Sequence, residues 1–327
     1  MITFVLGVAD LADTRFAISP VQEAMGSLWA LRDPGRHALH LPWRRSVLRE
    51  LERPGGLDSR LLFALVGDTL TLPDFLTPRP ESFAPDLEDQ LATIRATPPA
   101  LVRRDIRATH APRPVPEVLD RVDAAGDGPV HELLDDLCDL LRRYWRMALE
   151  PAWPRMRLVL EADMTYRARQ LATGGARLLF ADMHPNLRWR DGELEISEML
   201  GRYRTEAAGR GLLLIPSVFT YKPIPPLSAD EPPYLTYPSR GIATLWAPPP
   251  EPDDTALAAL LGAPRATLLR LLEEPMPTVE LARRLAVTPS AVSQHLQVLH
   301  ATGLVSRTRA GRHVLYHRTS LAQRLVS

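Results

Sequence analysis

The segment TVELARRLAVTPSAVSQHLQVLHATGLVSRTRAGRHVLYHRT, from Thr278 to Thr319, decides the fold of the C-terminal part of the chain. Its pattern predicts, in order, a helix over 278–285, a tight turn over 286–288, a helix that Gly303 ends, and a two-stranded ribbon around 310–311. We expect Thr278 and Thr288 to be the N-caps of the two helices, since a threonine side chain accepts a hydrogen bond from the first turn. Pro289 suits the first helical position after Thr288.

The second helix has two chemically different faces. Its aliphatic residues recur at helical spacing on one face: Val292, Leu296 and Leu299. The polar side chains on and beside the opposite face are Ser290, Gln294 and Gln297, with Ser293 on the flank. Glutamine can pair with adenine through two hydrogen bonds, and serine reaches several base edges. His295 lies beside the apolar edge, where it can reach a phosphate.

Basic residues gather in the ribbon that follows. Arg307, Arg309 and Arg312 surround its tip, which suits a hairpin that straddles a nucleic-acid backbone or enters the minor groove. Residues 278–327 carry seven arginines against the single acid Glu280, a net charge of +6. The whole chain has a net charge of +0, so residues 1–277 carry −6. A basic segment attached to an acidic body indicates a polyanionic partner.

Together these features predict a winged helix-turn-helix that binds double-stranded DNA. The alternative, a helix pair used only for protein packing, explains neither the polar outer face nor the basic tip. The residues predicted to contact DNA are Thr288, Ser290, Ser293, Gln294, His295, Gln297, Arg307, Arg309 and Arg312.

The same stretch resembles the ArsR/SmtB winged-helix repressors. The matching signatures are SAVSQHL in the second helix, GLV after it and GRHVLY in the ribbon. The resemblance covers about the last quarter of the chain and implies a homodimer that binds a palindromic operator and represses transcription. The N-terminal part of the chain is similar to an uncharacterised domain that often precedes winged helices of this family.

The chain departs from that family at the positions that hold metals. Metal-sensing members carry Cys-x-Cys where this chain has Pro277 and Val279, or Asp-x-His where it has Ser320 and Ala322. Neither pair supplies ligands for zinc or a softer metal. We therefore expect no metal cofactor at these positions. The predicted terminal helix is also short, so we expect the N-terminal domain to supply dimer contacts, an effector site, or both.

At 327 residues the chain exceeds what one core usually supports. We predict an α+β fold, mainly α, with a mixed N-terminal domain over 1–246 and a winged helix over 255–327. The APPPEPDD segment over 247–254 is the predicted linker. The elements expected in the N-terminal domain are a strand over 2–8, helices over 20–33, 43–51, 130–149 and 154–173, strands from 176 onward, a hairpin turn at 190–192 and a helix over 196–208.

No catalytic constellation is visible, so we predict a regulator rather than an enzyme. The alternative is an enzymatic or small-molecule-binding N-terminal domain with the winged helix as an accessory tether. Cys138 has the spacing of a buried structural residue. The pairs His37 with His40, and Asp182 with His184, are too small for a metal site, and we expect polar loop roles for them. No apolar run is long enough to span a bilayer, and we expect a cytoplasmic protein without membrane contact.

Overall fold

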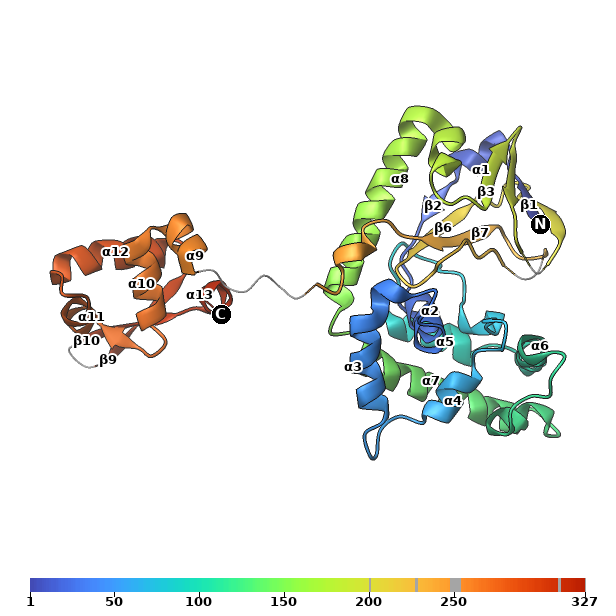
Figure 1. The fold of residues 1–327 in the computed structure, drawn as a ribbon, viewed down its shortest axis with the longest axis horizontal. Coiled ribbons are helices and arrows are strands. Elements are labelled where there is room, and N and C mark those ends of the chain that lie inside the picture. The colour runs from blue at the N-terminus through green and yellow to red at the C-terminus, as the bar shows by residue number, and fades with distance from the viewer. Residues whose placement is uncertain (200, 227–228, 248–253, 311–312, 327) are drawn as a thin grey trace. The chain divides into compact units, whose positions relative to one another are not determined.

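The computed structural model describes residues 1–199, 201–226, 229–247, 254–310 and 313–326. The chain divides into two compact units, Met1–Trp246 and Ala247–Ser327. The N-terminal unit combines helices with two sheets, and the C-terminal unit combines helices with a third sheet (Figure 1). The fold class is α+β, mainly α, as the sequence predicted. The linker predicted over 247–254 falls mostly on 248–253, which lie outside the described residues.

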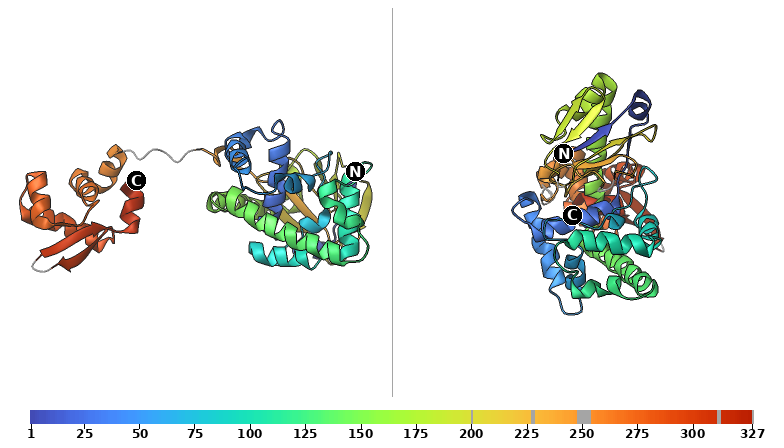
Figure 2. Two further views of the ribbon diagram at one scale, coloured as in Figure 1. Left: turned by 90° about the horizontal axis from the view of Figure 1, so that it is seen from below. Right: turned by 90° about the vertical axis from the view of Figure 1, so that its right-hand side faces the viewer.

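Helices make up most of the first 181 residues of the N-terminal unit. They are α1 (Val8–Ala12), α2 (Pro20–Arg32), α3 (Leu41–Leu51), α4 (Ser59–Ala64), α5 (Leu87–Arg95), α6 (Pro99–His110), α7 (Gly128–Ala148) and α8 (Trp153–Ala181), with 3-10 turns η1 (Ala38–His40), η2 (Asp74–Leu76) and η3 (Glu117–Asp123). A further 3-10 turn, η4 (Ile242–Thr244), lies near the end of this unit. Figures 1 and 2 show α2 to α7 gathered in one part of this unit, while α8 lies with the sheets. Among the described residues, no helix has the length and apolar character needed to cross a bilayer.

The strands of the N-terminal unit form two sheets. They are β1 (Ile2–Val5), β2 (Arg15–Phe16), β3 (Leu187–Arg190), β4 (Glu193–Ile196), β5 (Tyr203–Glu206), β6 (Leu213–Ser217) and β7 (Tyr234–Pro238). The first sheet has the order β3-β4-β1-β5, in which β1 pairs antiparallel with β4 and parallel with β5. The second is the parallel sheet β2-β6-β7. Every residue of the central strand β6 is buried, as expected of a strand covered on both faces.

Local signals predicted several of these elements correctly. The Ser19 side chain caps α2 by accepting from the Gln22 N–H at 3.0 Å. Asp191 and Gly192 have φ of 51° and 85° at the turn between β3 and β4, which is the conformation of a tight hairpin. Cys138 is buried in α7 and donates to the Leu91 carbonyl at 3.5 Å. Burial raises the pKa of this thiol to about 11, so the structural interpretation of Cys138 is confirmed.

Two secondary-structure predictions for this unit are wrong. Residues 176–181 are not a strand but continue α8 beyond a kink at Gly175, where φ is +63°. Ala176, Leu179 and Phe180 are all buried, and their spacing of three and four is helical rather than alternating. The helix expected over 196–208 is instead the end of β4, a connection and β5, which complete a sheet with β1.

A cluster of aromatic rings anchors the end of the N-terminal unit. The Trp246 indole N–H donates to His40 Nδ1 at 2.9 Å, and its ring stacks on Trp43 with centroids 5.9 Å apart. His40 is buried, which lowers its pKa to about 4 and keeps it a neutral acceptor. His37 is also buried and bonds the carbonyls of Asp33 and Phe219. The expectation of loop roles for these histidines is therefore corrected: both belong to the core.

Glu23 is a buried carboxyl group in the first turn of α2. Its two oxygens accept hydrogen bonds from the Val218 N–H at 3.1 and 3.3 Å. Burial raises its pKa from 4.5 to about 8, against the opposing effect of these hydrogen bonds. The folded protein therefore holds this proton at neutral pH, whereas the unfolded chain releases it near pH 4.5.

Replacing Glu23 by glutamine tests this protonation state. The folded state binds one more proton than the unfolded state between pH 4.5 and about 8, so the contribution of Glu23 to stability is lost as pH rises through that window. Glu23→Gln removes this loss, and we expect the variant to gain on the order of a few kcal/mol relative to wild type between pH 5 and 8.5. The assay is denaturant unfolding followed by tryptophan fluorescence, since all 6 tryptophans lie in this unit.

His40, whose pKa is lowered, changes the stability of both proteins with pH in the direction opposite to Glu23. This contribution is the same in the variant and in wild type, so it cancels when their stabilities are subtracted. A stability difference between Glu23→Gln and wild type that does not change with pH would contradict the protonated state.

Candidate nucleic-acid interface

The C-terminal unit has its own small core. Its elements are α9 (Asp254–Leu261), α10 (Ala263–Leu271), β8 (Met276–Pro277), α11 (Thr278–Leu285), α12 (Pro289–Ala301), β9 (Val305–Ala310), β10 (His313–Arg318) and α13 (Ser320–Val326). Val292, Leu296 and Leu299 of α12 are each at most 1% exposed and pack with Leu268 of α10 and Leu281 of α11. The predicted inner face of this helix is confirmed.

A tight turn sets the angle between α11 and α12. Ala286 has the left-handed conformation with φ of 53°, and the Val287 N–H donates to the Ala282 carbonyl at 3.1 Å. Thr288 then caps α12, because its side-chain oxygen accepts from the Ala291 N–H at 3.3 Å. The second cap predicted from the sequence is confirmed. Thr278, by contrast, is the first residue of α11 rather than its cap, a position that Pro277 holds.

The outer face of α12 is polar and open. Ser290, Gln294 and Gln297 are exposed, and Ser293 and His295 are half-buried at its edges. Within the described part of the chain, no hydrogen bond occupies the side chains of Ser290, Gln294 or Gln297. The helix therefore presents donors and acceptors that are available to another molecule.

The hairpin of β9 and β10 follows α12 directly. The strands are antiparallel, with Arg309 opposite Val314 and Arg307 opposite Tyr316. Arg307 and Arg309 are two residues apart and exposed, so they lie on one face of the hairpin. Arg312, predicted at the tip, lies outside the described residues.

A third strand that the sequence did not reveal supports this hairpin. Met276 and Pro277 form β8, which pairs antiparallel with Tyr316 and Leu315 of β10. Met276 is a single residue between Pro275 and Pro277, so the segment carries no recognisable strand pattern and the sequence indicates only a break there.

Not every arginine of the basic segment is available for contact. The Arg318 side chain is only 7% exposed, and its Nε donates to the Leu272 carbonyl at 3.2 Å. Arg283 and Arg284 both bond Glu280, at 2.6 and 3.0 Å, and these bonds lower the Glu280 pKa to about 2. The positive charge that faces outward beside α12 therefore comes mainly from the hairpin.

At the positions where the ArsR/SmtB resemblance would place metal ligands, this chain has Pro277, Val279 and Ala322, whose side chains do not bind metal ions. Pro277 lies in β8, Val279 is an exposed residue of α11, and Ala322 is fully buried in α13. Across the described residues there is no group of three or more His, Cys, Asp or Glu side chains that could hold a metal ion. Asp182 instead accepts from the Tyr166 hydroxyl at 2.8 Å, and His184 accepts from the Asn186 N–H at 3.1 Å.

One comparison with known protein families agrees with the local architecture. A family model described as a helix-turn-helix domain matches residues 265–308, from α10 to β9. Among solved structures, the chain is similar to a double mutant of Lactococcus lactis ZitR in apo form, with 28% identity and a TM-score of 0.20. That match covers 22% of this chain and 58% of the ZitR chain, less than two thirds of its length. A search of curated proteins gave no match. The C-terminal unit is a helix-turn-helix domain.

Thr288→Ala tests the cap on which the orientation of α12 depends. Loss of an N-cap hydrogen bond costs about 1 kcal/mol, which corresponds to roughly fivefold faster amide exchange from local opening. We expect this acceleration in peptides covering 289–301 of the full chain, measured by hydrogen exchange with mass spectrometry. Thr278→Ala is the matched control, because Thr278 is not a cap. Equal exchange of 289–301 in both variants would show that the Thr288 hydroxyl does not stabilise α12.

Proposed function

We propose that this chain is a DNA-binding transcriptional regulator. In this proposal α12 recognises the bases of operator DNA, and the β9–β10 hairpin is a wing that contacts the DNA backbone. The helix-turn-helix match supports DNA binding as the general activity. In this proposal α12 enters the major groove with Ser290, Gln294 and Gln297 toward the base edges. The other predicted contacts, Thr288, Ser293, His295, Arg307, Arg309 and Arg312, bind phosphates or adjacent edges.

One observation carries the proposal. The capped helix α12 buries its aliphatic residues and leaves a row of polar side chains without hydrogen-bond partners in the described chain. Glutamine and serine on an exposed helix are ordinary by themselves. A row of them beside a hairpin that bears Arg307 and Arg309 matches the two requirements of a DNA reader, base-edge contacts and phosphate contacts.

The finer parts of the proposal follow the ArsR/SmtB resemblance. The regulator is a homodimer that binds a palindromic operator and represses transcription, without metal control at the positions usual in that family. It is not an enzyme, and it acts in the cytoplasm, where operator DNA is available. The N-terminal unit contributes dimer contacts, an effector site, or both.

Selection from random DNA followed by gel shift tests the general function. We expect the full chain to enrich a two-fold symmetric sequence and to bind it at least about 10³-fold more tightly than unrelated DNA at the same salt concentration. Absence of any enriched sequence would rule out the operator-binding role. Selection of one unsymmetric half-site would retain DNA binding and reject the palindrome.

Two substitutions separate base reading from backbone contact. Gln294→Ala should lower the discrimination at particular base pairs by about 1–3 kcal/mol while leaving binding to unrelated DNA unchanged. Arg307→Ala should weaken binding to all sequences alike and reduce the magnitude of the salt slope by about 1. Both quantities come from fluorescence anisotropy titrations over a range of salt concentrations.

Arg60→Ala is the charge-matched control, because the Arg60 side chain is 83% exposed in the N-terminal unit. If Arg60→Ala weakened DNA binding as much as Arg307→Ala does, the hairpin would not be the site of phosphate contact. A reporter gene under the selected operator then distinguishes repression from activation, and sedimentation equilibrium measures the oligomeric state.

A further inference from the structure

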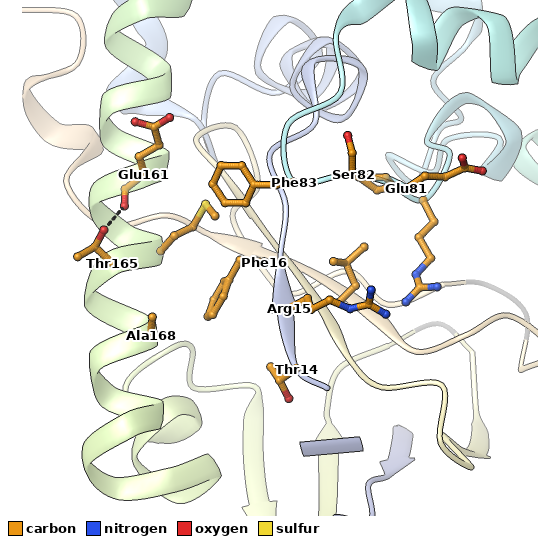
Figure 3. Close-up of a pocket in the computed structure, with 13 residues that line it drawn as sticks. Thr14, Arg15, Phe16, Glu81, Ser82, Phe83, Glu161, Thr165 and Ala168 are labelled. Atoms are coloured by element: carbon orange, nitrogen blue, oxygen red, sulfur yellow. Dashed lines mark hydrogen bonds between the residues drawn. The ribbon is translucent and has the colours of Figure 1, made fainter. Parts of the chain in front are cut away.

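The N-terminal unit contains a groove of about 1020 Å³ between α8, the edge strand β2 and the loop over 79–83 (Figure 3). This volume is in the range of sites that hold drug-sized molecules. Four residues of α8 line one side at spacings of three and four: Glu161, Met164, Thr165 and Ala168. The groove therefore runs along a single face of the helix.

Apolar side chains cover the part of the groove nearest α8. Phe83 is 55% exposed although it is a large aromatic residue, and Phe16 is half-buried beside it. Figure 3 shows both rings directed toward α8. Met164 and Leu213 complete this surface and are each 6% exposed. A ligand lying here would remove an exposed aromatic surface from water.

Two arginines line the other part of the groove without counter-ions. Within the described residues, neither the Arg15 side chain nor the Arg79 side chain forms a hydrogen bond or an ion pair. The Nε of Arg79 is buried and unpartnered, which is costly for a group that donates so strongly. Burial lowers the Arg79 pKa, and the neighbouring charges of Arg15 and Arg210 lower it further. The positive charges of these neighbouring arginines favour the binding of an anion in the groove.

The acids that line the groove do not cancel this charge. Glu161 is already paired with Arg157, whose Nε lies 2.7 Å from the carboxylate. Glu81 is exposed, and Figure 3 shows its carboxylate pointing away from the Phe83 ring.

The loop that carries Arg79 is held in place before any ligand binds. Pro78 and Pro80 flank Arg79 and restrict its backbone. The Phe83 carbonyl accepts from the Ile18 N–H at 2.9 Å, which fixes the loop beside β2. The cationic and aromatic walls are therefore preorganised, which reduces the entropy cost of binding.

We propose that this groove binds a small organic anion whose acidic group lies between Arg15 and Arg79 and whose apolar body packs against Phe16 and Phe83. Carboxylates and phosphate monoesters share the chemistry that arginine recognises. The site is independent of the proposed DNA binding, because its test measures ligand binding directly.

The test uses isothermal titration of the full chain with three probes of similar shape: 1-naphthoate, 1-naphthyl phosphate and the uncharged 1-naphthamide. We expect saturable binding of at least one anion and at least about tenfold weaker binding of the amide. Arg15→Gln and Arg79→Gln should each weaken anion binding by about tenfold and leave amide binding unchanged. Phe83→Ala should weaken binding of all three probes. The tighter of the two anions identifies the acidic group.

Arg177→Gln is the matched control, since Arg177 is an exposed arginine of α8 that does not line the groove. Tryptophan fluorescence and circular dichroism of each variant check that the fold is retained. The proposal is overturned if neither anion binds below about 10 mM. It is equally overturned if the amide binds as tightly as the anions, or if Arg177→Gln weakens binding as much as Arg79→Gln does.

Discussion

The contact of Val292, Leu296 and Leu299 with α10 and α11 fixes the rotation of α12 about its own axis. Because a helix repeats every 3.6 residues, burying these three side chains forces Ser290, Gln294 and Gln297 outward. The Thr288 cap and the left-handed Ala286 then fix where the helix begins. The chemistry that this unit presents is thus set by its core. A substitution that repacked this core would reorient the polar side chains of α12 although none of them had been replaced.

This dependence explains why the C-terminal unit could be predicted from sequence. Its determinants lie close together in the chain: a cap three residues from the N–H that donates to it, apolar residues four and three apart, and two paired strands separated by only two residues in the sequence. The N-terminal unit depends instead on pairings across the whole chain. Ile2 pairs with Ile196 and Tyr203, and Arg15 pairs with Leu213. No local pattern encodes these partners, so the sequence predicts a helix over 196–208 where the structure has strands paired with β1.

The proposed DNA interface and the groove in the N-terminal unit differ in the same respect: the first is local in sequence and the second is not. Residues of the proposed DNA interface fall within a continuous segment, and the spacing of Ser290, Gln294 and Gln297 alone places them on one face of α12. The groove joins Arg15, Arg79 and Met164 from three separate segments, and none of them belongs to a motif. The groove is recognised from the structure and not from the sequence, by the buried Arg79 Nε that has no hydrogen-bond partner and by the exposed Phe83 ring. Such features appear only once the fold has brought the segments together.

Helix α8 lines the groove and also contacts the last segment of the N-terminal unit. Met164 and Thr165 line the groove, while the adjacent Asp163 accepts from the Arg240 N–H at 3.2 Å. The Arg240 guanidinium also lies 3.8 Å from the centre of the Tyr166 ring. Residues 163 to 166 form less than two turns of one helix, so a ligand that displaced α8 at the groove would also displace its contacts with Arg240. Six residues later, Trp246 ends the N-terminal unit, stacked on Trp43 and bonded to His40. The part of α8 that lines the groove therefore also holds Arg240, six residues before the end of this unit.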